Sequence, residues 1–202
     1  IVNKILTNKP DLISKVEVAG PGFINFHFAP QVFVDFLNKI QDEGLKLDQT
    51  LSNQKIILEY TNTNVFKTMH IGHLMGNVIG ESLVRLYAEL GAEVKRCTYL
   101  GDVGLHVAKA IWGMIQSHPA FPQDTDSLED KMNFLNNAYS NGSRAYEDDA
   151  TAKEEIKVIN KKVFEKSDPE IQIYYDKGRA WSLEHFEEMY KKLGTKFDYY
   201  FF

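Results

Sequence analysis

The chain has little of several features that would place it in a specialised class of protein. It has one cysteine among 202 residues, which excludes an internal disulfide framework and fits a reducing compartment. No apolar run approaches the length that spans a bilayer, and no signal peptide is visible. Basic residues are outnumbered, and the net charge of −5 argues against a generally basic nucleic-acid binder. The sequence has no internal repeat and no low-complexity segment.

What is present is enough apolar material for a folded core. At 202 residues and 44% hydrophobic, the chain can fold as one domain or two. It begins at Ile1 rather than methionine and stops at Phe202 within an aromatic run. We therefore expect a piece of a longer protein.

The middle of the chain carries the clearest pattern of secondary structure. An apolar run at 56–60 predicts a buried strand, and a polar loop follows at 61–64. From His70 the apolar residues take helical spacing up to Gly91, a residue typical of a helix end. A second strand is predicted at 94–100. This order predicts one βαβ unit of a parallel sheet, with its first loop at the carboxyl end of a strand, where open α/β sheets bind ligands.

The loop and the first helical turn carry residues suited to a phosphate. His70 and His73 are three apart, so both lie on one face of that turn and can donate hydrogen bonds to an anion. Gly72 lets a flat ring or a sugar approach the backbone, and Lys67 adds a mobile positive charge. The helix N-terminus contributes unpaired N–H groups and partial positive charge. Such donors suit a phosphoryl group that gains charge in a transition state, where losing one typically costs about 3–4 kcal/mol.

Simpler interpretations remain open for each residue taken alone. The two histidines could be half of a zinc site, but no third ligand is obvious nearby, since Cys97 lies inside a predicted strand. They could equally be ordinary first-turn residues. Lys67 alone is typical of a solvated surface, and Asn64 alone of a turn. The combination, in order on a strand, loop and helix, favours the phosphate site, and no protein metal site is predicted.

Several segments resemble one known family. The run His70-Ile-Gly-His73 resembles the signature of class I aminoacyl-tRNA synthetases and of the wider group of nucleotidyltransferases that attack the α-phosphate of ATP. The longer run 59–74, together with Gly-Asp-Val-Gly at 101–104, looks like arginyl-tRNA synthetase in particular. Residues 16–28 resemble the end of that family's additional N-terminal domain, and residues 186–199 resemble its insertion helix returning to the catalytic sheet.

The resemblance implies how the loop would handle ATP. His70, Gly72 and His73 would hold the ATP phosphates and adenosine, and Lys67 would contact the phosphates. Lys67, His70 and His73 are the implied catalytic residues. Asn64 completes the implied ATP-binding set.

The resemblance also implies an arginine site at the end of the first strand. Glu59 matches a carboxylate that pairs with the substrate guanidinium, which two parallel hydrogen bonds would orient. Asn64 matches the residue that holds the α-amino group, and Asn62 is a nearby candidate. Glu59 could instead be a surface carboxylate, but an acid that ends an apolar strand favours the functional interpretation.

Three departures from the family pattern surround these residues. Thr63 stands where the family often has proline, and Met75 stands where arginine is common. The residues at 101–106 read Gly-Asp-Val-Gly-Leu-His in place of a usual Gly-Asp-Trp-Gly-Thr-Gln. None of these changes touches the histidine signature.

The implied function is arginine–tRNA ligase activity. The resemblance implies ATP with Mg²⁺, L-arginine and tRNA(Arg) as partners, with the remainder of a synthetase chain. The complete protein is expected to be a cytoplasmic monomer with no membrane association. Because the chain is acidic, tRNA would have to use local patches or parts outside it. Two alternatives stay open, namely another nucleotidyltransferase or synthetase with the same signature, and a non-catalytic tRNA-binding relative.

The expected fold is α/β, a parallel Rossmann-like half-sheet with a helical insertion, preceded by a partial small α+β N-terminal domain. We expect the N-terminal domain at 1–46, the half-sheet at 52–118, the insertion at 119–194 and a return strand within 195–202. The further elements predicted are strands at 16–18, 23–28 and 196–200, and helices from Pro30 to Gly44, from Gly104 to the His118-Pro119 break, at 127–139, at 149–165 and from Asp168 to Gly194.

Overall fold

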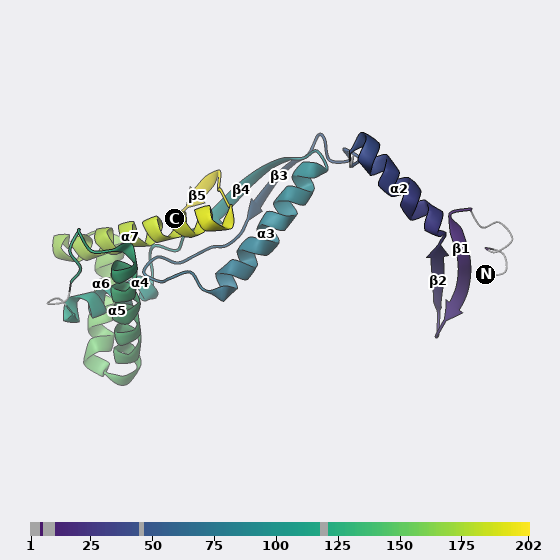
Figure 1. Cartoon of the computed structure of the whole chain (residues 1–202). Coiled ribbons are helices and arrows are strands. Elements are labelled where there is room, and N and C mark those ends of the chain that lie inside the picture. The colour runs from purple at the N-terminus through teal and green to yellow at the C-terminus, as the bar shows by residue number, and fades with distance from the viewer. Residues whose placement is uncertain (1–4, 6–10, 45–46, 118–120) are drawn as a thin grey trace. The chain divides into compact units, whose positions relative to one another are not determined.

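A computed structural model describes Ile5 and residues 11–44, 47–117 and 121–202. The chain divides into two compact units, Ile1–Asp48 and Gln49–Phe202, which are taken separately below (Figure 1). His118 and Pro119, near which a helix end was predicted, lie outside the described residues, and the helix before them ends at Gln116.

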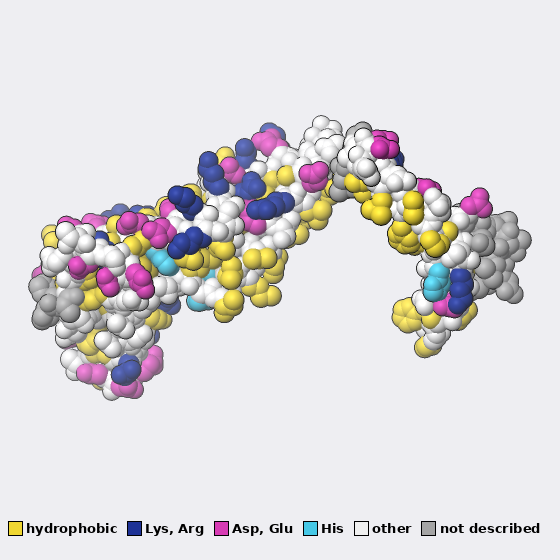
Figure 2. All heavy atoms as spheres, viewed as in Figure 1, with side chains coloured by type: hydrophobic (Ala, Val, Ile, Leu, Met, Phe, Trp, Pro, Cys, Tyr) yellow, Lys and Arg dark blue, Asp and Glu magenta, His cyan; other side chains and the backbone are white. Residues whose placement is uncertain are grey.

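The first unit is a hairpin followed by a helix. Strand β1 (Ile13–Ala19) pairs antiparallel with β2 (Phe23–Phe28), and Gly20 and Gly22 take positive φ in the turn between them. Helix α2 (Pro30–Glu43) begins with proline in its first turn, as predicted, and ends at Gly44. None of the residues of α2 is buried, and the helix exposes apolar side chains on its surface (Figure 2), among them Phe33, Phe36 and Leu37.

The second unit contains a three-stranded parallel sheet. Strands β3 (Lys55–Glu59), β4 (Glu93–Tyr99) and β5 (Tyr199–Phe201) stand in the order β3-β4-β5. Helix α3 (Ile71–Glu89) connects β3 to β4, so the predicted βαβ unit is present and the predicted α/β fold is confirmed.

The return strand starts later than predicted. Phe197 is buried in the core, so the chain is still turning inward there. Asp198 then exchanges two hydrogen bonds with Arg96, one through its backbone N–H and one through its carboxylate. Regular pairing with β4 begins at Tyr199.

Four helices form the region between β4 and β5. They are α4 (Leu105–Gln116), α5 (Leu128–Asp148), α6 (Ala150–Glu165) and α7 (Pro169–Leu193). Side chains cap three of them, because Ser127, Asp149 and Asp168 accept hydrogen bonds from backbone N–H groups of the first turns. Helix α5 runs well beyond its predicted end at Tyr139, since Gly142 lets it pack closely on α4: a Cβ there would lie 1.9 Å from the carbonyl oxygen of Lys109.

The core joins the sheet, the loop after β3 and the four helices. Met114 is fully buried in this core, whereas Trp112 is only partly buried. Helix α3 keeps several apolar side chains on the surface (Figure 2), among them Ile71, Met75 and Val78. Among the residues described, no helix combines the length and apolar character needed to cross a membrane.

Helix α7 holds the loop after β3 in an unusual backbone conformation. Phe66 has φ 63°, in the left-handed region, yet its side chain is fully buried. Its backbone N–H donates to the Ser182 hydroxyl at 2.8 Å. Its ring lies on Gly178, where a Cβ would come within 2.0 Å of Cε1. Thr63, the residue found in place of proline, lies with its hydroxyl 3.1 Å from that of Tyr190.

This contact predicts an inverted result for glycine and alanine on α7. At most helical sites alanine is favoured over glycine by about 1 kcal/mol. Gly178→Ala should instead destabilise the protein by about 1–3 kcal/mol, because the added methyl displaces the Phe66 ring. The matched control is Ala180→Gly on the exposed face of α7, where the ordinary order should hold. Urea unfolding midpoints measure both, and a Gly178→Ala protein as stable as the parent would contradict the contact.

Candidate functional site

The first turn of α3 is capped by its own histidines. His70 is the N-cap residue, and its Nδ1 accepts a hydrogen bond from the Gly72 N–H at 3.1 Å. The His70 N–H donates in return to Nδ1 of His73 at 3.2 Å. The two rings stack with centroids 3.8 Å apart. This is a capping box in which imidazoles replace the usual hydroxyl and carboxylate.

The cap fixes which ring nitrogen carries the proton. Nδ1 accepts in both rings, so in the neutral form of each ring the proton must lie on Nε2. Burial lowers the pKa of His73, and the charges of His70 and Lys67 lower it further. His73 is therefore neutral at pH 7 and keeps one N–H donor free of the cap. The start of α3 thus carries two Nε2–H donors beside a helix N-terminus, an arrangement that suits an anion.

Gly72 is tied to the orientation of the first ring. A Cβ at this position would lie 3.0 Å from Cε1 and 3.1 Å from Nδ1 of His70, closer than nearly all real contacts. A larger residue would push the ring out of its hydrogen bond. The glycine therefore serves the cap as well as leaving the backbone open.

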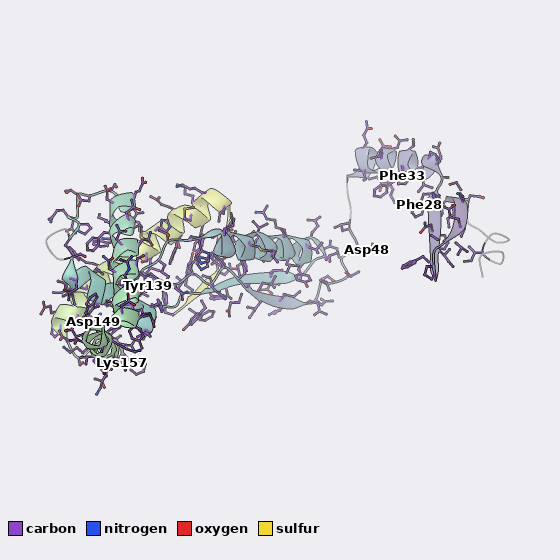
Figure 3. All side chains as sticks on the ribbon, turned by 90° about the horizontal axis from the view of Figure 1, so that it is seen from below. Phe28, Phe33, Asp48, Tyr139, Asp149 and Lys157 are labelled. Atoms are coloured by element: carbon purple, nitrogen blue, oxygen red, sulfur yellow. The ribbon has the colours of Figure 1, made fainter. Side chains whose placement is uncertain are left out.

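Lys67 lies beside the same turn. Its Nζ is 4.1 Å from the centroid of the Tyr139 ring. Tyr139 belongs to α5 and is labelled in Figure 3. Burial is the main cause that lowers the pKa of His106, and the Lys67 charge acts in the same direction. The Lys67 charge also lowers the pKa of His73, as noted above. The ammonium therefore lies close enough to both imidazoles to disfavour their charged forms.

Glu59 and Asn62 form a pair at the end of β3. Asn62 donates from Nδ2 to Oε1 of Glu59 at 3.0 Å. Its Oδ1 accepts from the Tyr99 N–H at 2.9 Å, so the amide bridges the ends of β3 and β4. The carboxylate of Glu59 is exposed and held in direction. Both polar groups of the Asn62 side chain are engaged within the protein.

Asn64 lies against the turn that follows β4. It forms an isolated parallel bridge with Gly101, where a Cβ would come within 2.4 Å of Oδ1 of Asn64. The Gly101 carbonyl accepts from the Val65 N–H at 3.1 Å and lies 3.2 Å from Nε2 of His106. His106, a departure from the family pattern, thus helps to fix the turn that supports Asn64.

Other residues near this edge were not predicted from the sequence. Asp102 accepts hydrogen bonds from the Tyr175 hydroxyl at 3.0 Å and from Nε of Arg179 at 3.1 Å, which ties the turn after β4 to α7. Asn136 and Tyr139 of α5 contact Thr68 and Lys67. Their signal in the sequence is weak, because each partner lies about 70 residues away along the chain.

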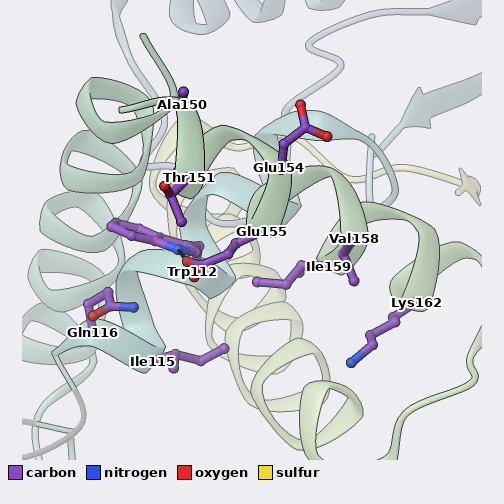
Figure 4. A pocket seen from close by; sticks show the side chains of 10 residues that line it. All are labelled: Trp112, Ile115, Gln116, Ala150, Thr151, Glu154, Glu155, Val158, Ile159 and Lys162. Atoms are coloured by element: carbon purple, nitrogen blue, oxygen red, sulfur yellow. Dashed lines mark hydrogen bonds between the residues drawn. The ribbon is translucent and has the colours of Figure 1, made fainter. Parts of the chain in front are cut away.

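A pocket of greater volume than the one beside His70 lies elsewhere. Side chains of α4 and α6 line this open pocket of about 800 Å³, which Figure 4 shows from close by. One of them, Trp112, donates a hydrogen bond to Glu155 at 2.7 Å. None of the predicted site residues lines this pocket. A smaller pocket of about 250 Å³ is lined by His70 and apolar neighbours. We place the candidate site at the loop after β3 and the first turn of α3, because the hydrogen-bonding histidines and the lysine lie there, and of the predicted site residues only His70 lines the smaller pocket.

A metal site does not emerge from the part of the chain that the structure describes. No group of three or more His, Cys, Asp or Glu side chains there could hold an ion. Cys97 is buried in β4. The histidines of the signature use Nδ1 for the helix cap, which leaves them as donors rather than ligands.

Comparison with known proteins identifies the family. Residues 37–198 match the family described as tRNA synthetases class I (R), catalytic domain. The chain therefore belongs to the class I tRNA synthetases. Residues 1–28 match the arginyl tRNA synthetase N terminal domain, which confirms the arginyl branch expected from the sequence.

Individual relatives agree with that assignment. The chain is 30% identical to an arginine–tRNA ligase of Fusobacterium nucleatum over 205 residues, covering 100% of this chain and 35% of the relative. It is 37% identical to the cytoplasmic arginine–tRNA ligase of Bos taurus over 58% of this chain and 17% of the relative. The crystal structure of arginyl-tRNA synthetase from Plasmodium falciparum shares the fold, with a TM-score of 0.57 and 20% identity, covering 98% of this chain and 34% of that one. The chain thus spans about a third or less of the length of these proteins.

The histidine cap predicts how His73 responds to pH. Its pKa should lie below the ordinary 6.5, and its neutral form should carry the proton on Nε2. Above pH 6.5 the ring is neutral in both the folded and the unfolded chain, so stability is unaffected. As pH falls below 6.5 the unfolded chain gains a proton first, and the contribution of His73 to stability declines. An NMR titration of ¹⁵N-histidine measures tautomer and pKa. Titration above 6.5, or an Nδ1–H tautomer, would contradict the cap.

Proposed function

We propose that the chain forms part of an arginine–tRNA ligase, which activates arginine with ATP and transfers it to the 3′ end of tRNA(Arg). The observation that carries the proposal is the convergence at the carboxyl edge of the sheet. Two Nε2–H donors and a lysine are grouped at the helix N-terminus of α3, and an oriented carboxylate stands at the end of β3. The family match supports the same function.

In the proposed first step the arginine carboxylate attacks the α-phosphorus of ATP. A bond forms between a carboxylate oxygen and that phosphorus, and the bond to the pyrophosphate leaving group breaks, with Mg²⁺ bound to ATP as part of the substrate. The carboxylate is already a nucleophile, so no general base is needed. The Nε2–H groups of His70 and His73 and the Lys67 ammonium would stabilise charge on the phosphoryl group. Catalysis then rests on positioning and electrostatics.

Arginine would bind at the end of β3. The Glu59 carboxylate would pair with the guanidinium through two parallel hydrogen bonds, and Asn62 would hold that carboxylate in direction. Asn64, supported by Gly101, would receive the α-amino group. In the second step the adenylate would pass arginine to tRNA(Arg).

The remaining partners follow from the same proposal. A synthetase needs a complete sheet and surfaces for tRNA, and the relatives are much longer than this chain. We therefore propose that this chain works with the rest of a monomeric synthetase. A cytoplasmic location is supported by the similarity to the cytoplasmic arginine–tRNA ligase of Bos taurus. The domain limits proposed are 1–46, 52–118, 119–194 and 195–202.

Aminoacylation by the complete protein tests the proposal. With total tRNA, ATP–Mg²⁺ and each amino acid offered separately, only arginine should be charged. Glu59→Gln should lower kcat/KM for arginine by about 10- to 100-fold, because a hydrogen bond between two charged groups is lost. The 202-residue chain by itself should not charge tRNA. Charging of another amino acid would show that Glu59 has been misassigned. ATP–Mg²⁺ chemistry without tRNA charging would favour another nucleotidyltransferase, and tRNA binding without ATP binding a non-catalytic relative.

Two substitutions at one histidine separate its structural from its chemical role. In His73→Asn the side-chain oxygen can take the place of Nδ1 and accept from the His70 N–H, but the Nε2–H donor is lost. Stability should be kept while ATP–pyrophosphate exchange falls about 100- to 1,000-fold. His73→Ala should lose both stability and ATP–pyrophosphate exchange, because it removes the cap acceptor and the Nε2–H donor. Equal exchange by His73→Asn and the parent would show that the cap, and not the donor, is what matters.

A further inference from the structure

The helical insertion supplies side chains to the segment that leads into α3. Helix α5 approaches this segment from a part of the chain that the family signature does not include. Two of its residues, Asn136 and Tyr139, are three apart and therefore lie on one face of the helix. Each makes a distinct contact with the neighbouring pair Lys67 and Thr68.

Asn136 forms a hydrogen bond with the backbone of the residue that follows Lys67. Its Oδ1 accepts from the Thr68 N–H at 3.2 Å, and its amide Nδ2 lies 3.4 Å from the Thr68 hydroxyl. A backbone N–H in this position has no strand partner, so the side chain replaces one. The contact fixes where the chain turns immediately after Lys67.

Tyr139 fixes the lysine side chain itself. The Lys67 ammonium lies 4.1 Å above the ring centroid, well within the range of a cation–π contact. The Lys67 side chain also lowers the pKa of Tyr139, so the phenol and ammonium are electrostatically coupled. Both residues are partly buried, which strengthens such a contact relative to one in open water.

The direction of this contact matters for the site. Burial is the largest cause of the lowered pKa of His73 and of His106. The charge of Lys67, held over the ring, lowers both pKa values further. A lysine in free solution would spread over many rotamers and hold its charge further from the histidines on average. The ring holds the ammonium at a place from which its charge acts on both imidazoles.

We propose that Tyr139 and Asn136 are positioning residues of the ATP site, which hold Lys67 beside the first turn of α3. Neither touches the reacting atoms; both act through Lys67. The inference rests on the proposed function, since it assigns these residues to the binding of a triphosphate. The helical insertion then contributes positioning residues to the ATP site.

The first test is the loss of the ring. In the complete protein, Tyr139→Leu should reduce kcat for ATP–pyrophosphate exchange about tenfold, the scale of one cation–π contact, with KM for arginine unchanged. Tyr139→Phe should retain nearly full activity, because the ring is what holds the ammonium. A Tyr139→Phe protein as impaired as Tyr139→Leu would overturn the assignment.

A matched control lies on the same helix. Tyr146 also packs beneath lysines, with Lys109 at 4.3 Å and Lys153 at 4.9 Å from its ring centroid, but it does not contact Lys67. Tyr146→Leu should cost similar stability and leave exchange kinetics unchanged. If Tyr146→Leu lowers kcat as much as Tyr139→Leu, the effect is a general loosening of α5 and the proposal fails.

A double-substitution cycle separates this inference from the proposed function. Lys67→Met alone should lower exchange, and adding Tyr139→Leu should then lower it no further, because Tyr139 acts through Lys67. Additive losses would sink the positioning role and leave the synthetase assignment intact. Absence of exchange in the parent protein would instead overturn the proposed function. Where Tyr139→Leu does not fold, fluorinated phenylalanines at 139 replace it: kcat should fall with each added fluorine, and a flat series contradicts the contact.

Discussion

The geometry of the site depends on one buried phenylalanine in a left-handed backbone conformation. A residue with a Cβ in that conformation costs roughly 1–2 kcal/mol. Phe66 is held there because its N–H is bonded to Ser182 and its ring fills the space left open by Gly178. The turn places Lys67 over the Tyr139 ring on one side and Asn64 beside Gly101 on the other. Without the contact to α7, nothing in the loop's own sequence would select this path.

Contacts between residues close together in the chain were predictable from the sequence, whereas contacts between distant residues were not. The His70–His73 pair was predictable because a spacing of three fixes neighbours within one helical turn. The parallel pairing of β3 with β4 was predictable, because strands joined through one helix usually lie side by side with a right-handed connection. The partners of Lys67 were hidden, since a cation over an aromatic ring leaves no spacing in the sequence when its members are about 70 residues apart. The late start of β5 was hidden for the same reason, as Arg96 of a distant strand decides it.

The insertion and the half-sheet divide the work differently from what their order in the chain implies. Backbone of the sheet presents the loops, while side chains of α5 and α7 decide where those loops go. Asp102 illustrates this, because its carboxylate belongs to the turn after β4 and its hydrogen-bond donors belong to α7. Changes in the insertion can therefore alter ligand affinity without touching a residue of the signature.

The pairing of β4 with β5 has a consequence for biosynthesis. Cys97 and Tyr199 are neighbours in the sheet but about 100 residues apart in the chain. Closing so long a loop is entropically costly unless the intervening residues are already compact. Helices rich in local contacts form fast, so the α4–α7 region can assemble first and bring Asp198 to Arg96. On the ribosome β5 emerges well after β4, and until it docks, the edge of β4 stays open to wrong partners.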